Sequence, residues 1–163
     1  MKFEIYCDGS TRGNGKENAV GAWAWVVHES GNKLFENCQA EKNTTNQRME
    51  LTAAAEALET VCHDLVAPFD RVIVYTDSAY LHNCVVQSWW RNWQTNGWKN
   101  SKKQPVANQD LWERLIPYFE MPEIEFVKVK GHAGGRNEHE KWNDYVDDLA
   151  QSASVKLMGE MNK

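Results

Sequence analysis

The sequence predicts an α/β fold in which helices flank one mixed β-sheet. Three segments in which apolar and polar residues alternate come first, and this period of two is typical of strands. An alanine-rich helical segment then leads into a short β-branched segment, and the order strand, helix, strand is typical of a crossover between parallel strands. The chain has 163 residues, of which 42% are hydrophobic and 25% charged, as expected for one soluble globular domain.

Short turns connect the first three predicted strands. Gly13 and Gly15 follow the first strand, which is expected to end at Asp8-Gly9-Ser10, and Ser30-Gly31-Asn32 separates the second strand from the third. Because these connections are short, consecutive strands should pair in antiparallel fashion. The three strands are expected at residues 2–8, 20–28 and 33–40.

A helix is predicted next, because Thr44 followed three residues later by Gln47 has the pattern of a capping box. The helix should begin near residues 44 to 46 and end near His63. Glu50 falls on its apolar stripe, where an unpaired carboxylate needs a cation, a set of donors or a chemical role. Alternatively, a slightly rotated helix leaves Glu50 in solvent at the edge of the stripe. The apolar members of the stripe are Ala54, Ala57, Leu58 and Val61.

Two predicted strands are followed by an aspartate. Asp77 follows the strand at residues 71–76, and Asp8 follows the first strand. A crossover would make these strands parallel neighbours, and ligands bind at the carboxyl ends of such strands. Together with Glu50 the aspartates form a convergent acidic group, and a hard divalent cation would offset their repulsion. Each aspartate also has an ordinary interpretation, since Asp8-Gly9 suits a turn and Asp77-Ser78 suits a helix N-cap.

Charge is distributed unevenly along the chain. Between Asp77 and Asp110 there is no acidic residue, and the four cations give this segment a charge of +4, so the rest carries −9 of the total of −5. Residues 88–103 contain four tryptophans beside these cations. Such a segment suits nucleic acid, because cations neutralise phosphates and aromatic rings stack on bases. Alternatively, the tryptophans join a protruding helix to the body of the domain. The cations are Arg91, Lys99, Lys102 and Lys103.

The last third of the chain contains two predicted helices and one strand. Asn108 or Asp110 can cap a helix that Pro117 or Pro122 ends. Residues 123–129 alternate as a fifth strand, and a Gly-rich loop follows at residues 130–135. A C-terminal helix then carries acidic residues on or beside its inner edge. These acidic residues are Asp144, Asp147 and Asp148.

Several function classes are disfavoured. No stretch approaches the roughly 20 apolar residues of a membrane span, and the N-terminus lacks a signal-peptide pattern, so a cytoplasmic protein without membrane contact is expected. The four cysteines form no C-x-x-C pair, which predicts free, mostly buried thiols instead of a zinc or redox site.

Taken together, these motifs resemble the type 1 ribonucleases H, in particular the bacterial form with a basic protrusion. The resemblance extends over about residues 2–151. It rests on the order and spacing of Asp8-Gly9-Ser10, Thr44 to Leu51, Thr76-Asp77-Ser78, the Trp-rich and Lys-rich segment, Val129 to Gly134, and Asn143 to Ala150.

The resemblance implies a ribonuclease H-like fold with a five-stranded mixed sheet, three antiparallel strands and then two parallel ones, flanked by helices. It implies one domain over residues 1–163, with a core at about 2–151 and a helix end and tail at 152–163. The implied activity is endonucleolytic hydrolysis of the RNA strand of RNA·DNA hybrids by a monomer, leaving 5′-phosphate and 3′-hydroxyl ends. Such an enzyme would remove RNA primers and R-loops. Two Mg²⁺ ions, with Mn²⁺ as a substitute, would act with the substrate.

The resemblance also implies roles for individual residues. The metal ligands would be Asp8, as the bridging ligand, Glu50, Asp77 and Asp147, and His132 would assist proton transfer or product release. Counting from His132 instead of aligning the last helix favours Asp144 as the fourth ligand, because the intervening loop at 136–141 is longer than in the family. Asn14 and Asn46 would contact RNA 2′-hydroxyls, Thr45 and Asn108 a DNA phosphate, and the protrusion would bind through Trp89, Trp93, Trp98, Lys99 and Lys102.

A further departure from the family and two alternative functions accompany this interpretation. Ala79 stands where the family commonly has glutamine, which concerns substrate affinity and strand discrimination more than cleavage chemistry. A non-catalytic hybrid-binding module would be expected to lack a carboxylate, whereas all of them are present. A DNA nuclease of the same superfold is the other alternative, and Asn14, Asn46 and the protrusion favour the hybrid.

Overall fold

The computed structural model describes residues 1–13, 17–64, 69–131 and 137–162 and contains one five-stranded sheet with the strand order β3-β2-β1-β4-β5. The first three strands pair antiparallel, and β4 pairs parallel with both β1 and β5, as the sequence predicts. The strands are β1 (Lys2–Arg12), β2 (Val20–Glu29), β3 (Asn32–Lys42), β4 (Arg71–Thr76) and β5 (Ile124–Lys128).

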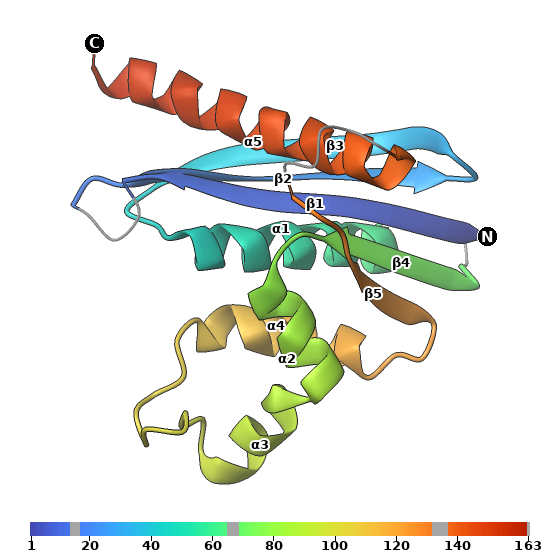
Figure 1. Cartoon of the computed structure of the whole chain (residues 1–163), viewed down its shortest axis with the longest axis vertical. Helices are drawn as coiled ribbons and strands as arrows, with labels where there is room; N and C mark the ends of the chain where they lie inside the picture. The colour runs from blue at the N-terminus through green and yellow to red at the C-terminus, as the bar shows by residue number, and fades with distance from the viewer. Residues whose placement is uncertain (14–16, 65–68, 132–136, 163) are drawn as a thin grey trace.

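Helices cover both faces of the sheet (Figure 1). The C-terminal helix α5 lies on one face and α1 on the other, and α2, α3 and α4 form a lobe beyond α1 (Figure 1). The helices are α1 (Asn46–Glu59), a π-helical turn η1 (Thr60–Asp64), α2 (Ala79–Gln87), α3 (Trp89–Asn96), α4 (Gln109–Phe119) and α5 (Glu138–Met161).

Alternation along the strands sorts side chains between two hydrophobic clusters. Phe3, Ile5 and Cys7 lie in the larger cluster with residues of α1, whereas Tyr6 lies in the smaller cluster with residues of α5. The two clusters follow from the period of two, because successive side chains of a strand point to opposite faces. Burial of the central strands β1, β2 and β4 makes this part of the sheet a rigid frame for the polar groups at its edge.

The first turn of α1 differs from the prediction by one residue. Thr45, not Thr44, is the N-cap, and its hydroxyl accepts a hydrogen bond from the backbone N–H of Arg48 at 3.2 Å. Thr44 is buried instead, and its methyl group lies over Gly21 of β2, where a Cβ would come within 2.5 Å of it. Packing against β2 therefore decides which of two adjacent threonines caps the helix.

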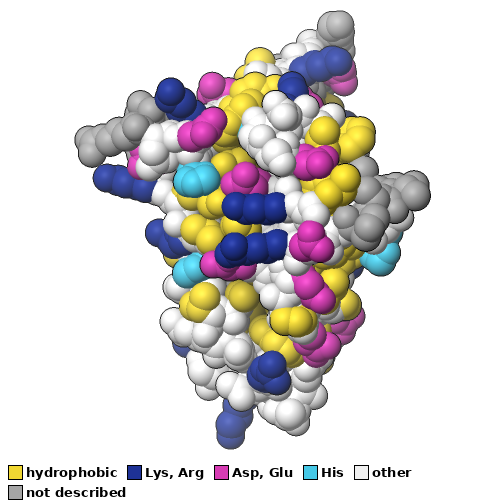
Figure 2. All heavy atoms as spheres, turned by 90° about the vertical axis from the view of Figure 1, so that its right-hand side faces the viewer, with side chains coloured by type: hydrophobic (Ala, Val, Ile, Leu, Met, Phe, Trp, Pro, Cys, Tyr) yellow, Lys and Arg dark blue, Asp and Glu magenta, His cyan; other side chains and the backbone are white. Residues whose placement is uncertain are grey.

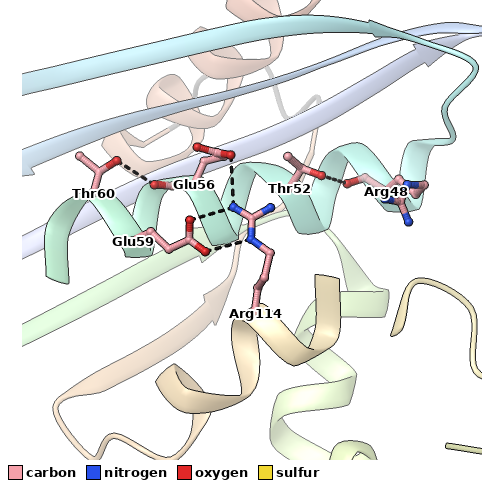
Figure 3. Close-up of polar contacts among 6 residues, drawn as sticks. All are labelled: Arg48, Thr52, Glu56, Glu59, Thr60 and Arg114. Atoms are coloured by element: carbon pink, nitrogen blue, oxygen red, sulfur yellow. Dashed lines mark hydrogen bonds and ion pairs between the residues drawn. The ribbon is translucent and has the colours of Figure 1, made fainter. Parts of the chain in front are cut away.

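Arg114 of α4 connects the lobe to α1 (Figure 3). Its guanidinium donates to both carboxylate oxygens of Glu59 at 2.8 and 2.9 Å and to Glu56 at 3.2 Å. The Thr52 and Thr60 hydroxyls donate to carbonyls of the preceding turn of the helical stretch. The guanidinium holds the pKa of Glu59 below its usual range. Because the pair is about one-third exposed, it contributes at most about 1 kcal/mol, and its main effect is on the orientation of α4.

The strand β1 does not end at Asp8 as predicted. It continues to Arg12, with Asp8 opposite Ala24 and Gly9 opposite Trp23 of β2. The parallel pairing with β4 stops earlier, at Tyr6. The turn interpretation of Asp8-Gly9 is therefore wrong, because β2 supports β1 beyond the point where β4 leaves it.

The structure decides two helix boundaries. Of the two prolines that could end α4, Pro117 lies inside the helix, because the buried face continues through Tyr118, and α4 ends at Phe119, before Pro122. The helix α5 begins at Glu138, where the side chain of Asn137 accepts from the backbone N–H of Glu140. Residues 138–141, predicted to lie in a loop, are thus the first turn of a longer helix.

The described cysteines are free thiols, as predicted, although only Cys7 and Cys84 are fully buried. Among the described residues, no helix has the length and apolar character needed to cross a membrane.

His28 of β2 is a buried base under α5, with only 3% of its surface exposed. Its ring packs edge-on against Trp142 with centroids 4.1 Å apart, and its Nε2 has no hydrogen-bond partner among the described residues. Burial lowers the pKa of His28, and the charges of Glu4 and Glu138, which raise it, do not outweigh that effect. Lys33 lowers it further.

We expect His28→Phe to remove an acid-sensitive contribution to stability. The unfolded chain takes up the histidine proton near pH 6.5, whereas the folded chain takes it up only at lower pH. The contribution of His28 to the free energy of unfolding is therefore complete above about pH 6.5 and is lost as the pH falls below that value. Urea unfolding at pH 8, 6.5 and 5 should show the wild-type protein losing free energy of unfolding relative to the variant. Parallel curves for the two proteins would contradict this assignment.

Candidate active site

Three carboxylates from different elements meet where β1 and β4 separate. Asp8 comes from β1, Glu50 from α1 and Asp77 from the residue after β4. One carboxylate oxygen from each lies within 4.8 Å of the other two, and among the described residues they form a group able to hold a metal ion. The site is therefore at the carboxyl ends of the parallel strands, as the sequence predicts.

Close approach of α1 to β1 brings Glu50 to Asp8. A Cβ at Gly9 would collide with the backbone nitrogen of Glu50 and the carbonyl carbon of Met49, and would lie 2.7 Å from the Met49 Cβ. Glycine is therefore the residue that lets the helix touch the strand. The Gly9 N–H also donates to Asp8 Oδ1 at 2.9 Å, which fixes that carboxylate.

Asp77 is not the cap of α2. Ser78 caps this helix, because its hydroxyl accepts from the backbone N–H of Leu81 at 3.1 Å. Asp77 is instead approached by Asn143 of α5, whose Nδ2 donates to Asp77 Oδ2 at 3.4 Å, and by Gly131, where a Cβ would come within 2.7 Å of the same oxygen. The cap interpretation of Asp77 is thus wrong, and its carboxylate faces the site.

The electrostatics of the group favour a bound cation. Burial raises the pKa of Asp8 well above its usual range, and the charges of Glu50 and Asp77 raise it further. Burial and Asp77 likewise raise the pKa of Glu50. Glu50 Oε2 is buried without a hydrogen-bond partner among the described residues. An all-oxygen, negatively charged set with an unsatisfied buried oxygen fits a hard divalent cation, so the donor chemistry is suited to Mg²⁺ or Mn²⁺.

Asp147 approaches this group from α5. It is 9% exposed, and Gln151 donates to its Oδ2 at 2.9 Å. Its charge contributes to the raised pKa of both Asp8 and Glu50. Of the other two candidates on this helix, Asp144 is half-buried and Asp148 is exposed. The four predicted carboxylates therefore belong to one electrostatic group.

Several predicted substrate contacts surround the N-terminus of α1. Thr45 and Asn46 are exposed there, and Arg48 donates to Asn108 Oδ1 at 3.2 Å and forms a bidentate pair with Asp110 at 2.9 and 3.1 Å. Asn108 has a left-handed backbone with φ of 63°. Arg48 thus joins the two segments that carry Thr45 and Asn108.

Two predicted site residues, Asn14 and His132, lie outside the described residues. Asn143 and Gly131 belong to motifs in the sequence, but no role is predicted for either residue from the sequence. In the structure both contact Asp77. Asn143 precedes Asp147 by one helical turn, so the same helix register that selects Asp147 could have identified it. The approach of Gly131 to Asp77 depends on the fold and has no signal in the local sequence.

The tryptophans of the protrusion pack against the body of the domain. Trp93 contacts Trp98 and Trp112, with ring centroids 5.8 and 5.4 Å apart, and Trp112 is fully buried. This packing confirms the structural interpretation of the aromatic residues. Trp89 and Trp93 nevertheless also line a hollow of about 540 Å³ together with Lys99.

Positive charge is concentrated on the protrusion, as the sequence predicts. Lys99 and Lys102 are exposed. Figure 2 shows Lys and Arg side chains at the lowest part of the molecule, whereas acidic and basic side chains are interspersed over the middle of the same face. The protrusion is therefore the cationic end of an otherwise acidic protein.

Comparisons with known proteins agree with this geometry. A family model described as RNase H matches residues 1–155. The ribonuclease H of Syntrophomonas wolfei is 44% identical over 155 residues, covering 95% of this chain and 97% of that protein. The chain belongs to the RNase H family. The family resemblance and the ribonuclease H class of enzyme predicted from the sequence are thereby confirmed.

Solved structures of RNase H1 type share the fold of this RNase H family member. LC9-RNase H1, described as a type 1 RNase H with the type 2 active-site motif, has a TM-score of 0.76 and 28% identity over 95% of this chain and 72% of that chain. LC11-RNase H1, solved in complex with an RNA/DNA hybrid, has a TM-score of 0.63 and 24% identity over 96% of this chain and 99% of that chain. The predicted ribonuclease H-like fold is confirmed.

Proposed function

We propose that this protein hydrolyses the RNA strand of RNA·DNA hybrids with two divalent cations, Mg²⁺ or Mn²⁺, and leaves 5′-phosphate and 3′-hydroxyl ends. The observation that carries the proposal is the group formed by Asp8, Glu50 and Asp77, with oxygens within 4.8 Å of one another. Family membership and the hybrid complex of LC11-RNase H1 support the substrate. Primer and R-loop removal are the cellular roles that fit such an activity.

The residues of the site have separate proposed roles in binding the cations, orienting their ligands and moving protons. Asp8, the central and deeply buried carboxylate, is proposed as the shared ligand, with Glu50, Asp77 and Asp147 around it. When bound, the cations supply Lewis-acid activation of the attacking water and charge stabilisation at the leaving 3′-oxygen. Asn143 orients Asp77 through its side-chain amide, and Gly9 keeps Glu50 against Asp8. His132 is proposed to assist proton movement or product release.

We propose that different residues contact the RNA strand and the DNA strand of the hybrid. Asn14 and Asn46 would contact RNA 2′-hydroxyls, which distinguish RNA from DNA. Thr45 and Asn108, linked by Arg48, would receive a phosphate of the DNA strand. The protrusion would bind further phosphates through residues that the sequence identifies, namely Trp89, Trp93, Trp98, Lys99 and Lys102. Such contacts favour the backbone and predict little sequence preference.

A cleavage assay with matched duplexes tests the proposed function. The protein would be incubated with labelled RNA·DNA, RNA·RNA and DNA·DNA duplexes and with single-stranded RNA, in Mg²⁺ and in EDTA. Cleavage of only the RNA strand of the hybrid, abolished by EDTA, is expected. Cleavage of DNA·DNA at a similar rate would indicate a DNA nuclease of the same fold, and hybrid binding without cleavage would indicate a binding module.

The fourth carboxylate can be identified by a paired substitution. We expect Asp147→Asn to lower the cleavage rate by about 100-fold, since an electrostatic group in a metal-dependent site typically contributes several kcal/mol. Asp144→Asn, the same change less than one helical turn away, should alter the rate less than about threefold. Single-turnover rates at saturating hybrid compare the two directly, and a larger loss for Asp144→Asn would reverse the assignment.

A further inference from the structure

Three aromatic rings form a stack on the α5 face of the sheet. The rings of Tyr6 and Tyr75 stack with centroids 4.8 Å apart and an interplanar angle of 11°. The His139 ring stacks on Tyr75 with centroids 4.4 Å apart and an angle of 19°. Tyr6 and His139 are also joined by a hydrogen bond of 2.7 Å between the phenol oxygen and Nδ1.

Each ring belongs to an element that supplies one carboxylate of the site. Tyr6 precedes Asp8 by two residues in β1, and Tyr75 precedes Asp77 by two residues at the end of β4. His139 lies two helical turns before Asp147 in α5. The stack therefore ties together the three separate elements that carry Asp8, Asp77 and Asp147.

The stack is placed where the strands begin to separate. Tyr6 and Tyr75 are opposite one another in the last parallel pair between β1 and β4. Beyond this pair β1 continues along β2 alone, so no ladder bonds between β1 and β4 control the spacing of Asp8 and Asp77. Ring packing at the last pair therefore constrains that spacing from the α5 face of the sheet, together with the hydrogen bond from Asn143 to Asp77.

The hydrogen bond joins the first turn of α5 to the last residue of β1 that pairs with β4. Tyr6 is buried, with 3% of its surface exposed, whereas His139 is an exposed residue in the first turn of α5. Either group can be the donor in this hydrogen bond, depending on the tautomer of the His139 ring. Removing the histidine partner would therefore leave the hydroxyl of the buried Tyr6 without the hydrogen bond it has in the structure, which is costly for a buried polar group.

We propose that Tyr6 and His139 are positioning residues for the metal site, and that their hydrogen bond fixes the distance between α5 and β1 and thereby places Asp147 beside Asp8. This inference rests on the proposed function, since it concerns the same carboxylates. Outer-sphere contacts that orient metal ligands typically change metal affinity by about 10-fold to 100-fold when removed. The stack acts on the ligands through the backbone, so its effect is expected at the low end of that range.

Tyr6→Phe and His139→Phe test this role, because each keeps an aromatic ring and removes one partner of the hydrogen bond. Tyr145→Phe is the matched control. Its hydroxyl also anchors α5 to the sheet, by donating to Glu36 Oε1 at 2.7 Å, but it lies at the exposed side of the helix, over β3. The three variants therefore undergo comparable ring substitutions in the same helix–sheet interface.

The primary measurement is the affinity of substrate-free protein for Mn²⁺ by titration calorimetry, with melting temperatures in EDTA as the measure of folding. We expect about 10-fold weaker Mn²⁺ binding for Tyr6→Phe and His139→Phe, no further loss in the double variant, and no change for Tyr145→Phe. Unchanged affinity with a lowered melting temperature would overturn the proposal and leave the stack a purely structural contact.

Hybrid cleavage distinguishes this inference from the proposed function. In the active protein, kcat should fall in Tyr6→Phe while KM for the hybrid stays the same, because the hydrogen bond is remote from the substrate-binding residues. If the wild-type protein cleaves hybrids and the variants bind Mn²⁺ as tightly as it does, only the positioning role is overturned. Weaker Mn²⁺ binding in the variants, with no hybrid cleavage by the wild-type protein, would overturn only the proposed function.

Discussion

Asp8→Asn protein is expected to lose hybrid cleavage by about 1000-fold or more and to melt at a higher temperature than the wild-type protein in EDTA. The loss of activity follows from removing the charge of the central ligand, because metal-assisted stabilisation of a transition state amounts to several kcal/mol. The amide oxygen of the introduced asparagine can still accept the Gly9 N–H that now reaches Asp8 Oδ1, so the local backbone has no reason to change.

The gain in stability has a separate cause. Asp8 is 2% exposed and faces two other carboxylates, so without a cation the folded protein bears the cost of desolvating and crowding these groups. Replacing one carboxylate by a neutral amide of the same shape relieves this cost. A stabilisation of about 0.5–2 kcal/mol is expected, because sites built for function are commonly destabilising to the fold.

Two measurements on the same protein preparations test both parts. Single-turnover cleavage in Mg²⁺ gives the loss of rate, and thermal unfolding in EDTA and in excess Mg²⁺ gives the stability. The cation should raise the melting temperature of the wild-type protein and leave Asp8→Asn almost unchanged. Asp148→Asn is the control, because it makes the same change on an exposed residue of α5. Retained Mg²⁺-dependent turnover in pure Asp8→Asn protein would refute the two-metal proposal.

Gly9→Ala is expected to destabilise the protein by about 1–3 kcal/mol and to lower the cleavage rate by about 100-fold. The added methyl group would occupy the position of the α1 backbone at Met49 and Glu50, and backbone atoms cannot rotate away as a flexible side chain can. Overpacking of this kind has a typical cost of about 1–3 kcal/mol. The helix must move away from β1 and take Glu50 with it, and displacements of about 1 Å can cost about 100-fold in rate.

Gly159→Ala is the matched control for this substitution. Gly159 lies in α5, and a Cβ there would meet nothing within 4 Å. Because Gly159 lies in the last turn of α5, this change should raise the free energy of unfolding by at most about 0.5 kcal/mol and leave cleavage unchanged. Urea unfolding and single-turnover cleavage at a temperature where both variants are folded give the comparison. A Gly9→Ala protein with wild-type stability would show that α1 does not rest on β1 as the structure indicates.

Much of the fold follows from local patterns in the sequence. The strand at Arg71–Thr76 was predicted with the observed bounds, because a short β-branched run between polar residues has few other structures available. Glu50 on an apolar stripe, and Asp8 and Asp77 after apolar runs, were sufficient to predict a convergent acidic site. Helical and strand periods are properties of adjacent residues, so they can be recognised without the rest of the chain.

The exact helix and strand ends, in contrast, depended on distant contacts. Thr44 and Thr45 have the same capping chemistry, and the contact of Thr44 with Gly21 of β2 decides between them. Pro117 is a helix-ending signal that the buried face of α4 outweighs. Where local preference and packing compete in this way, the neighbouring residues alone do not predict which of them prevails.

The sequence by itself determined the class of fold, the three central carboxylates and the cationic protrusion, because periodicity, spacing and charge are carried by the residues themselves. Only the tertiary structure decided that β1 continues past Asp8, that Ser78 rather than Asp77 caps α2, and that Asp147 is the buried aspartate of α5. These outcomes depend on which surfaces meet when β2, α2 and α5 pack, and the free energy of that packing is a property of pairs of elements distant in the chain.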